Sequence, residues 1–353
     1  MNSFGIMQYS FTHEQTYLNK LGAAGTESGF KVYRFVPHQS PGIEIEGLKY
    51  DERSHTWRKA NFPVPEFIYD RCFHSNFRKA PSLRFIHWLK NKTHACFLGY
   101  GLSGKWAVYK VLRTNPFVRE HLPLTAKLPF PTALTVLKEW LQTHKEFIVK
   151  PIHGSQGNGI ILITQELSGI SVQINHKGNV LQHTYDTTSH FLQLISGIIK
   201  NREYLIQEKL ILLDQNSKPF DRRVVMMKNT TTSWIEQGRA MRVGQKHSFV
   251  SNLHSGGCIL SDKELALSAT VLLAADEKIT KLSQVIATEL EKSFPPLFEL
   301  GLDFGIDHSG KVWLLEANSK PGHRIIQNQT LYPRLPFQYC RSLLNEKEGV
   351  EEI

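Results

Sequence analysis

The sequence predicts an α+β fold of several layers, with α/β character in its N-terminal part. Two observations support this class. Apolar runs typical of strands and amphipathic segments typical of helices follow each other in blocks along the chain. The chain also has 353 residues, which is too long for one ordinary hydrophobic core and suits two or three subdomains.

The first hundred residues are β-rich and irregular. Strands are expected over residues 4–10, 30–38 and 66–71, joined by turns that contain glycine and proline. A helix is expected over residues 81–92, where Pro81 occupies a position near the helix start that proline favours.

Two further helices are expected before the middle of the chain. The first covers residues 103–115 with Ser103 as its candidate N-cap, and the second covers residues 132–144 with Thr132 as its cap. A proline-marked connector separates them. Apolar side chains at helical spacing are Trp106, Tyr109 and Leu112 in the first helix, and Leu134, Leu137, Trp140 and Leu141 in the second.

The rest of the chain is rich in strands. A strand that ends near residue 151 enters a glycine-containing loop, and residues 159–165 form the strand that returns from this hairpin. A long helix is expected over residues 263–292. Further strands are expected over residues 204–210, 221–229, 233–243, 297–307 and 311–319.

Composition narrows the class of ligand. Subtracting 32 acidic from 42 basic residues gives a net charge of +10, which suits an anionic substrate, a nucleic acid or an acidic surface. No run of five basic residues occurs, so a basic surface around an anionic ligand site is preferred to nucleic-acid binding. No stretch approaches the ~20 apolar residues of a membrane span, and no signal peptide is recognised. The four cysteines are far apart, which indicates free thiols in a reducing cytoplasm.

The stretch FIVKPIHGSQGNGI contains the first candidate site. Three glycines follow an apolar strand that ends in Lys150 and Pro151. Because glycine has no Cβ, backbone N–H groups in such a loop approach phosphate closely, and Lys150 can reach the same phosphates. The alternative is a flexible hairpin with a solvated lysine. The lysine precedes the glycines and Ile160 follows them, so this is not a Walker A loop.

Two strands near the C-terminal end contain a candidate metal site. Asp303 lies on the first strand, and Glu316 and Asn318 lie two residues apart on the second, so these two point to the same face. Across a hairpin, Asp303 is expected to meet them. Carboxylate and amide oxygens are ligands that Mg²⁺ prefers. The alternative is a polar strand edge, which the apolar VWLL run disfavours because two buried carboxylates without a cation would be costly.

The end of the strand YLIQEKL is a candidate site for a nucleoside. Backbone donors and acceptors around Glu208, Lys209 and Leu210 are placed to contact the edge of an adenine, and Asp214 to accept hydrogen bonds from a ribose. A solvated strand end explains the same residues equally well.

Basic and polar side chains in three later segments are candidates for binding phosphate or carboxylate. Arg223, Arg239 and Arg242 can each bind such groups in a bidentate manner, although a surface salt bridge is the alternative for any one of them. A polar turn that contains Asn252 and His254 is expected to line the same cleft. No HExxH, GxSxG or CxxC motif occurs, so catalysis by a side-chain nucleophile is not expected.

Together these motifs resemble the ATP-grasp superfamily. The match extends from about Gly104 to Gly322 and contains, in the expected order, GKWAVYKVL, VKPIHGSQGNGI, LIQEKL, DRRVVM, SNLHSGG, and LDFG followed by LLEANSKPG. The SNLHSGG stretch is similar to that of RimK-type amino-acid ligases. With its N-terminal YDR and W…P elements, the whole chain looks like the bacterial endospore coat-associated group called YheC/YheD.

The resemblance implies an ATP-grasp fold with a pre-ATP-grasp N-terminal domain. The expected domains are residues 1–98 for the N-terminal domain, 99–200 for a central subdomain with a glycine-rich lid, and 201–345 for a C-terminal subdomain with the metal site.

The resemblance also implies a role for each matching residue. Arg242, and with it Arg239 or Arg223, would stabilise an acyl phosphate or its transition state. The metal ligands for Mg²⁺, with Mn²⁺ as an alternative, would be Asp303, Glu316 and Asn318. The residues that would bind ATP are Lys105, Lys150, Gly154, Ser155, Gly157, Gly159, Glu208, Lys209, Leu210 and Asp214.

Two positions depart from the family pattern. Gly104 stands where many relatives have Asp, which makes Lys110 a rival to Lys105 for contact with ATP. The interval from Asp303 to Glu316 is a residue longer than in RimK-like ligases, which makes Asp307 a rival metal ligand.

The function implied is an ADP-forming, Mg²⁺-dependent ligase that joins a carboxylate to an amine through an acyl phosphate. Its partners would be ATP, a small-molecule or peptide carboxylate, and an amine. The expected location is the cytoplasm, with spore-coat proteins as additional partners and the spore coat as an alternative location. Two other functions remain open: a spore-coat scaffold that has lost turnover, and a kinase of the same fold that phosphorylates a hydroxyl group.

Overall fold

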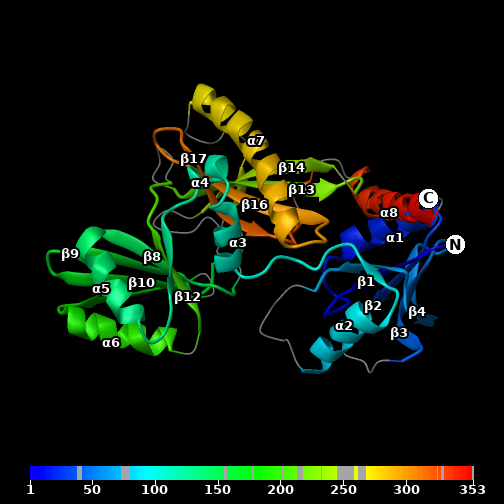
Figure 1. Cartoon of the computed structure of the whole chain (residues 1–353), viewed down its shortest axis with the longest axis horizontal. Helices are drawn as coiled ribbons and strands as arrows, with labels where there is room; N and C mark the ends of the chain where they lie inside the picture. Colours follow the sequence, from blue (N-terminus) through cyan, green and yellow to red (C-terminus); the bar gives the residue numbers. More distant parts are fainter. Residues whose placement is uncertain are drawn as a thin grey trace.

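In the computed structural model, the described part of the chain forms three β-sheets with helices packed against them (Figure 1). The structure describes residues 1–37, 42–72, 80–154, 157–176, 179–200, 202–212, 218–231, 233–244, 258–260, 268–323, 325–326 and 330–351. No helix in this part of the chain is long and apolar enough to cross a membrane.

The first sheet contains strands β1 (Ser3–Met7), β2 (Lys31–Phe35), β3 (Glu44–Asp51), β4 (Thr56–Pro63), β5 (Phe67–Asp70) and β6 (Cys96–Phe97). Their spatial order is β4-β3-β2-β1-β5-β6. β1 pairs in parallel with β2 and β5, and β5 pairs in parallel with β6. Helices α1 (Gln15–Glu27) and α2 (Ala80–Lys92) lie in these parallel crossovers, which confirms the α/β character of the N-terminal part.

Helix α1 is one of four elements of this region that the sequence did not predict; the others are the strands β3, β4 and β6. Its buried positions include Leu18 and Leu21, but Gly22 and Gly25 complete the same face. A Cβ on Gly22 would lie 2.4 Å from the ring of Tyr50, and a Cβ on Gly25 would lie 2.4 Å from Val32. The helix therefore packs through small residues, and these leave little apolar periodicity in the sequence.

The second sheet is wholly antiparallel, in the order β11-β10-β9-β8-β12-β7. Helices α5 (Ala133–Thr143) and α6 (Thr188–Ile199) pack against it and share one core with its strands. Its strands are β7 (Thr125–Leu128), β8 (Glu146–Pro151), β9 (Ile161–Glu166), β10 (Gly169–His176), β11 (Asn179–Tyr185) and β12 (Tyr204–Glu208). The expected domain bounds remain a prediction. Strand β12 lies after the expected bound at residue 200, yet it pairs with β7 and β8 within this sheet.

The third sheet is also antiparallel, in the order β15-β14-β13-β16-β17. Its strands are β13 (Phe220–Lys228), β14 (Trp234–Val243), β15 (Cys258–Leu260), β16 (Glu299–Ile306) and β17 (Val312–Asn318). Its core includes side chains of α3 (Lys105–Leu112), α4 (Pro116–Arg119) and α7 (Ala269–Ser293). Although α3 precedes the second sheet in sequence, it packs against α7 and the third sheet, and its N-cap is Gly104 instead of Ser103.

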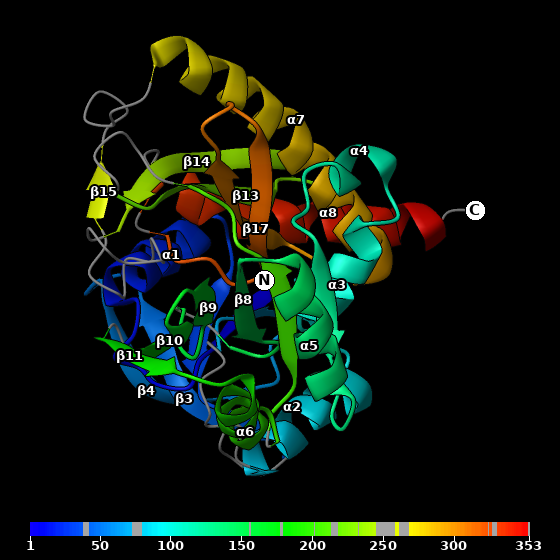
Figure 2. The same cartoon turned by 90° about the vertical axis from the view of Figure 1, so that its left-hand side faces the viewer.

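The first and third sheets share a second core. Side chains of β1, β5, β13 and α1 pack there with a 3₁₀ turn (Tyr332–Arg334) and helix α8 (Leu335–Glu351). The C-terminal helix consequently lies beside α1, and both chain ends lie on the same side of the molecule (Figure 1). The second sheet has its own core and lies apart from this body in Figure 1, at the end of the molecule that faces the viewer in Figure 2.

Candidate active site

A pocket lies where the second sheet faces α3 and the end of β17. It encloses about 430 Å³ of empty space, part of which is open to solvent. Its lining residues come from α3, the connector before β7, β8, β12 and β17: Lys105, Val108, Tyr109, Leu112, Leu122, Pro123, Thr125, Lys150, Leu205, Gln207, Leu314, Leu315, Glu316 and Ala317. The pocket therefore combines an apolar wall with two lysines and one carboxylate.

Lys105 connects the two sides of this pocket. It begins α3, and its Nζ donates to Gly154 O at 2.7 Å and lies 3.0 Å from Glu316 Oε1. Its backbone N–H donates to Ile152 O at 3.2 Å. The rival residue Lys110 is exposed on the same helix and is not part of the pocket lining. The geometry therefore favours Lys105 of the two predicted candidates.

Lys150 lies on β8 and faces the interior of the pocket. Its Nζ donates to Gln207 Oε1 at 2.8 Å, and Gln207 Nε2 donates to Thr125 Oγ1 at 2.7 Å. Burial, reinforced by the neighbouring charge of Lys105, lowers the pKa of Lys150 to about 8. An anion bound at this position would therefore stabilise the charged form of Lys150.

Gln207 and Thr125 were missed by the sequence reasoning. Gln207 precedes the predicted Glu208, and strand alternation puts these two neighbours on opposite faces of β12. Leu205 and Gln207, two residues apart, both line the pocket. A reading of β12 by alternation would have found Gln207, whereas Thr125 comes from a distant strand that only the fold brings near.

The glycine hairpin between β8 and β9 is anchored by Asn175 of β10. Asn175 Nδ2 donates to Gly157 O at 2.9 Å, and the backbone N–H of Gly159 donates to Asn175 O at 2.8 Å. Gly157 and Gly159 have φ values of 70° and 77°, which glycine adopts without strain. Ser155, also predicted to bind ATP, lies outside the described residues.

The predicted adenine-binding segment follows β12. Glu208 Oε1 accepts from the backbone N–H of Leu124 at 2.7 Å, and Lys209 Nζ lies 3.5 Å from Glu146 Oε2. These side chains fix the course of the strand end, which directly follows Gln207 of the pocket lining. Asp214 lies outside the described residues.

Asp303, Glu316 and Asn318 lie next to one another on β16 and β17. Asp303 pairs with Glu316 in the strand register, and Gly301 pairs with Asn318. A Cβ on Gly301 would lie 3.0 Å from both Arg223 Nη1 and Asn318 Nδ2, so glycine leaves room here for both side chains.

Two arginines converge on Asp303. Arg223 binds its carboxylate through Nε and, at 2.8 Å, through Nη2, and Arg242 Nη2 lies 2.9 Å from Asp303 Oδ1. Arg242 is also bound to Asp221, at 2.6 Å. Burial alone would raise the pKa of Asp303, but the two guanidinium groups outweigh it and hold this pKa below its usual range.

Arg239 is not part of this cluster. It pairs with Val224, whereas Arg242 pairs with Asp221, so the two arginines project from opposite faces of the third sheet. Arg239 binds Glu236, at 2.7 Å, and Asp276 of α7, at 2.9 Å. Of the three predicted arginines, the structure therefore brings two to Asp303 and directs the third to α7.

Asp307, the rival to Asp303, is used inside the turn between β16 and β17. Its carboxylate accepts from the backbone N–H groups of Ser309 and Lys311, at 2.9 and 3.1 Å, and from Trp313 Nε1 at 2.8 Å. These bonds close the hairpin, which leaves Asp303 as the carboxylate opposite Glu316. Asn252 and His254 lie outside the described residues.

The donor set fits a divalent cation such as Mg²⁺. Two carboxylates and an amide oxygen are hard ligands. In the described part of the chain, no three His, Cys, Asp or Glu side chains gather at one point, so such a site depends on the amide of Asn318. Both carboxylates are paired with cationic side chains, at Lys105 and at the two arginines. An added cation is therefore best accommodated together with an anion.

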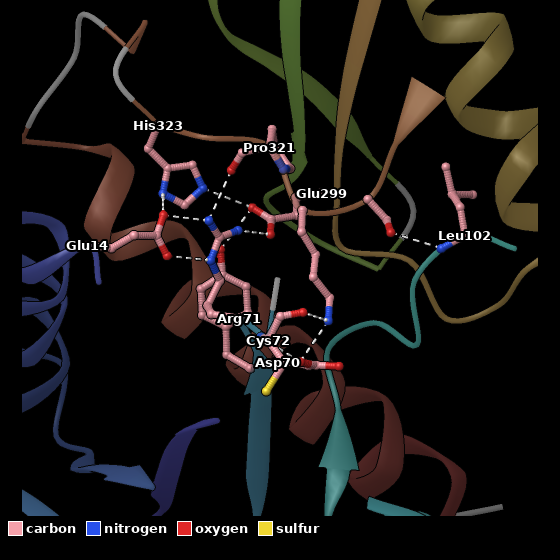
Figure 3. A network of polar contacts seen from close by, with 11 residues as sticks. Glu14, Asp70, Arg71, Cys72, Leu102, Glu299, Pro321 and His323 are labelled. Atoms are coloured by element: carbon pink, nitrogen blue, oxygen red, sulfur yellow. Dashed lines mark hydrogen bonds and ion pairs between the residues drawn. The ribbon is translucent and has the colours of Figure 1, made fainter. Parts of the chain in front are cut away.

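A buried polar network joins the segment after β17 to the first sheet (Figure 3). Arg71 is fully buried; it binds Glu14 and Glu299, and its Nη2 donates to Pro321 O at 3.0 Å. His323 Nε2 lies 3.2 Å from Glu299 Oε2. Burial would raise the pKa of Glu299, but Arg71 outweighs it and lowers this pKa. The sequence reasoning missed Arg71, because its partners are distant in sequence.

The fold and the site define an ATP-grasp protein. The structure is similar to that of D-cycloserine synthetase DcsG, with a TM-score of 0.57 and 10% identity over 95% of this chain and 99% of that one. It is similar to D-alanine–D-alanine ligase from Bacillus anthracis complexed with ATP, with a TM-score of 0.54 and 9% identity over 99% of both chains. At these identities the likeness establishes the fold.

The sequence comparison identifies the family within this fold. Residues 94–343 match the family model described as YheC/D like ATP-grasp. The chain is 30% identical to the endospore coat-associated protein YheC of Bacillus subtilis (strain 168), over 98% of this chain and 97% of the relative. The chain belongs to the YheC/D-like ATP-grasp family, which confirms the resemblance inferred from its motifs.

Proposed function

We propose that this chain is an ATP-dependent ligase that joins a carboxylate to an amine through an acyl phosphate and releases ADP. The main support is the pocket in which Lys105, Lys150 and Glu316 converge from α3, the second sheet and the third sheet. Two cations beside a carboxylate, above an apolar wall, are suited to a metal-bound polyphosphate with a planar base.

The nucleotide would occupy this pocket in a defined direction. Lys105 and Lys150 would bind its phosphates, and the hairpin from Gly154 to Gly159 would cover them with backbone N–H groups. The backbone around Glu208, Lys209 and Leu210 would contact the adenine edge, with Asp214 at the ribose. Leu314 and Ala317 on β17 would form the apolar floor.

Asp303, Glu316 and Asn318 would hold Mg²⁺, which when bound neutralises charge on the polyphosphate. Lys105 is paired with Glu316, and the binding of a metal–nucleotide complex would release this lysine toward the phosphates. Arg223 and Arg242 would keep Asp303 oriented and supply positive charge near the reacting carboxylate.

In the proposed reaction, a carboxylate oxygen of the first substrate bonds to the γ-phosphorus as the bond to ADP breaks. The amine nitrogen of the second substrate then bonds to the acyl carbon, loses a proton, and phosphate leaves. The protein holds the groups in line and stabilises the developing charge, which needs no side-chain nucleophile.

This proposal is tested by ADP release from Mg-ATP in the presence of paired carboxylates and amines, including amino acids, peptides and cell-wall precursors. We expect saturable release that Glu316→Gln lowers by about 100-fold or more, because the charge that holds the metal is lost. A phosphorylated hydroxyl product would indicate a kinase. No release with any pair would favour a protein that keeps the fold without turnover.

The location of the protein is part of the same proposal. The relative YheC is named an endospore coat-associated protein. We infer that this chain acts in the cytoplasm of a sporulating cell or at the spore coat, where spore-coat proteins would be its partners. Fluorescence microscopy of a tagged chain during sporulation would separate the two locations.

A further inference from the structure

Three consecutive residues where β5 ends, Tyr69, Asp70 and Arg71, form the YDR element of the sequence. We call them the YDR triplet. They belong to the first-sheet part of the chain, and the proposed function gives them no role. Tyr69 and Arg71 are buried, and the side chain of Asp70 is only 9% exposed. Each of the three side chains binds a residue beyond position 298, in or beside the third sheet.

Two residues of the triplet bind the start of β16. Tyr69 Oη donates to Glu299 Oε2 at 2.8 Å, and Arg71 Nη1 donates to Glu299 Oε1. Glu299 is the first residue of β16, and Asp303, a proposed Mg²⁺ ligand, lies further along the same strand. Both oxygens of the Glu299 carboxylate are therefore bound from the first sheet.

The triplet also binds the segment that follows β17 (Figure 3). Arg71 Nη2 donates to Pro321 O at 3.0 Å, and Lys320 Nζ lies 2.7 Å from Asp70 Oδ1. This segment begins directly after Asn318, which is the last residue of β17 and another proposed ligand. The triplet thus holds the two strands that contain the proposed metal ligands at the end where the start of β16 lies beside the end of β17.

The pairing of β16 with β17 makes this end depend on contacts from outside the hairpin. The register shifts between Asp303 and Phe304, so a bulge interrupts the ladder there. The pairs Gly301–Asn318 and Asp303–Glu316 lie on the same side of this bulge as the contacts of the triplet. Among the described strands, β17 is also the edge of its sheet. The position of Asn318 therefore depends on what holds the chain that follows it.

The triplet is a poor source of stability. The side chain of Arg71 is fully buried, and buried ion pairs seldom gain more from their attraction than they lose on leaving water. Glu14, which binds Arg71 at 2.7 and 3.1 Å, has a left-handed backbone conformation with φ at 52°. Such strained residues cluster at functional sites. The first and third sheets also share an apolar core, which joins them independently of these polar contacts.

We propose that the YDR triplet positions the Mg²⁺ site by fixing the start of β16 and the end of β17. Residues that orient metal ligands without touching the metal typically change its affinity by about 10- to 100-fold when they are altered. The triplet makes the metal affinity of the third sheet depend on its contact with the first sheet. The inference rests on the proposed function, because it takes Asp303, Glu316 and Asn318 as the ligands that hold Mg²⁺ beside the nucleotide.

The test is the Mg²⁺ dependence of ADP binding, measured by calorimetric titration of the full chain at increasing Mg²⁺ concentrations. Arg71→Lys keeps the charge but cannot bind Glu14, Glu299 and Pro321 O together, because lysine lacks the planar fork of arginine. We expect it to raise the Mg²⁺ concentration needed for half-maximal ADP affinity by about 10- to 100-fold. Saturating Mg²⁺ should restore the ADP affinity to within about twofold of the wild type, since a misplaced ligand set binds the metal weakly but still binds it.

Two further variants separate positioning from folding. The neutral pair Asp70→Asn/Lys320→Gln removes both charges of one contact together, which usually preserves folding, and it should also raise the Mg²⁺ requirement. Lys228→Gln is the matched control, because it breaks a buried ion pair, Lys228 with Glu291 at 2.5 Å, on the α7 side of the molecule. It should lower the thermal stability and leave the Mg²⁺ dependence as in the wild type.

Two results from the variants would overturn the inference: an unchanged Mg²⁺ requirement in both Arg71→Lys and the neutral pair, or a loss of ADP affinity that Mg²⁺ does not restore. If Arg71→Lys does not fold, the neutral pair decides alone. A wild type whose ADP affinity is independent of Mg²⁺ would overturn the inference as well.

The proposed ligase function fails separately. If the variants shift the Mg²⁺ requirement as expected while no carboxylate and amine cause the release of ADP from ATP, the positioning role stands and the ligase proposal is wrong. If ADP is released but the variants match the wild type in their Mg²⁺ requirement, the ligase proposal stands and the positioning role is wrong.

Discussion

Lys150 shows how this fold changes the chemistry of a single side chain. Its ammonium group is buried beside Lys105, and both effects disfavour the charged form, which lowers its pKa to about 8. The hydrogen bond to Gln207 fixes its direction but adds no negative charge. A phosphate would reverse this balance, because an anion favours the protonated lysine.

We therefore predict that Mg-ADP binding near pH 8 takes up a proton. Free Lys150 loses its charge as the pH rises through about 8, so the affinity should fall above that pH. Titration calorimetry in buffers of different ionisation enthalpy measures the uptake. Lys150→Arg stays protonated in this range and should bind without proton uptake; equal uptake by both proteins would contradict the assignment.

Residue identity and strand alternation predicted part of this site. Lys105, Lys150, Asp303 and Glu316 were selected from sequence, and the first two line one pocket with Glu316. Arg239 and Arg242 are three positions apart, so alternation in an unbroken strand puts them on opposite faces, but only the register of β13 and β14 shows that no bulge lies between them. The different contacts of these two arginines therefore follow from how β13 pairs with β14.

At the scale of elements, helix α3 links the two sides of the pocket. Val108 and Leu112 pack in the core of the third sheet, while the N-terminus of the helix is bonded to Ile152 of the glycine hairpin. This close approach depends on Gly104. A Cβ at that position would lie 2.6 Å from His153 Cε1 and 2.7 Å from Ile152 Cγ2.

We predict that Gly104→Ala lowers the free energy of unfolding by about 1–3 kcal/mol, the usual cost of overpacking, because Ile152 is buried and cannot move aside. The backbone of Gly104, at φ −59°, itself permits alanine. Denaturant unfolding measures the change. Gly197→Ala is the control: nothing lies within 4 Å of its Cβ in α6, so it should stabilise by about 0.4–1 kcal/mol.

Element prediction succeeded for several segments with strong apolar periodicity, but it left out the helices α1 and α6 and the strands β3, β4, β6, β7, β10 and β11, and β7 lies within the segment that was expected to be a connector. The expected segments gave α5 and the hairpin of β16 and β17 close to their observed bounds, whereas α7 begins at Ala269, six residues after its expected start. Helix α1 was not predicted, because Gly22 and Gly25 form part of its buried face. This face needs small residues because it packs against Tyr50 and Val32, which lie elsewhere in the chain.

At the scale of the molecule, the site is shared by two bodies. Lys150 and the glycine hairpin belong to the second sheet, which has its own core, whereas Lys105 and Glu316 belong to the third. The first and third sheets are joined by a common core and by the Arg71 network. The proposed nucleotide binding would therefore depend on groups from both bodies at once, which no local sequence pattern could specify.

The central claim is that this shared pocket binds a magnesium nucleotide, and titration of the chain with Mg-ADP tests it most directly. We predict saturable binding that Lys150→Met weakens by about 10- to 100-fold, the value of a hydrogen bond to a charged group, without loss of thermal stability. Lys127→Met, on strand β7 of the same sheet and paired with Glu203, should bind normally. Equal affinity in the wild type and Lys150→Met, or no binding by the wild type, would contradict the account.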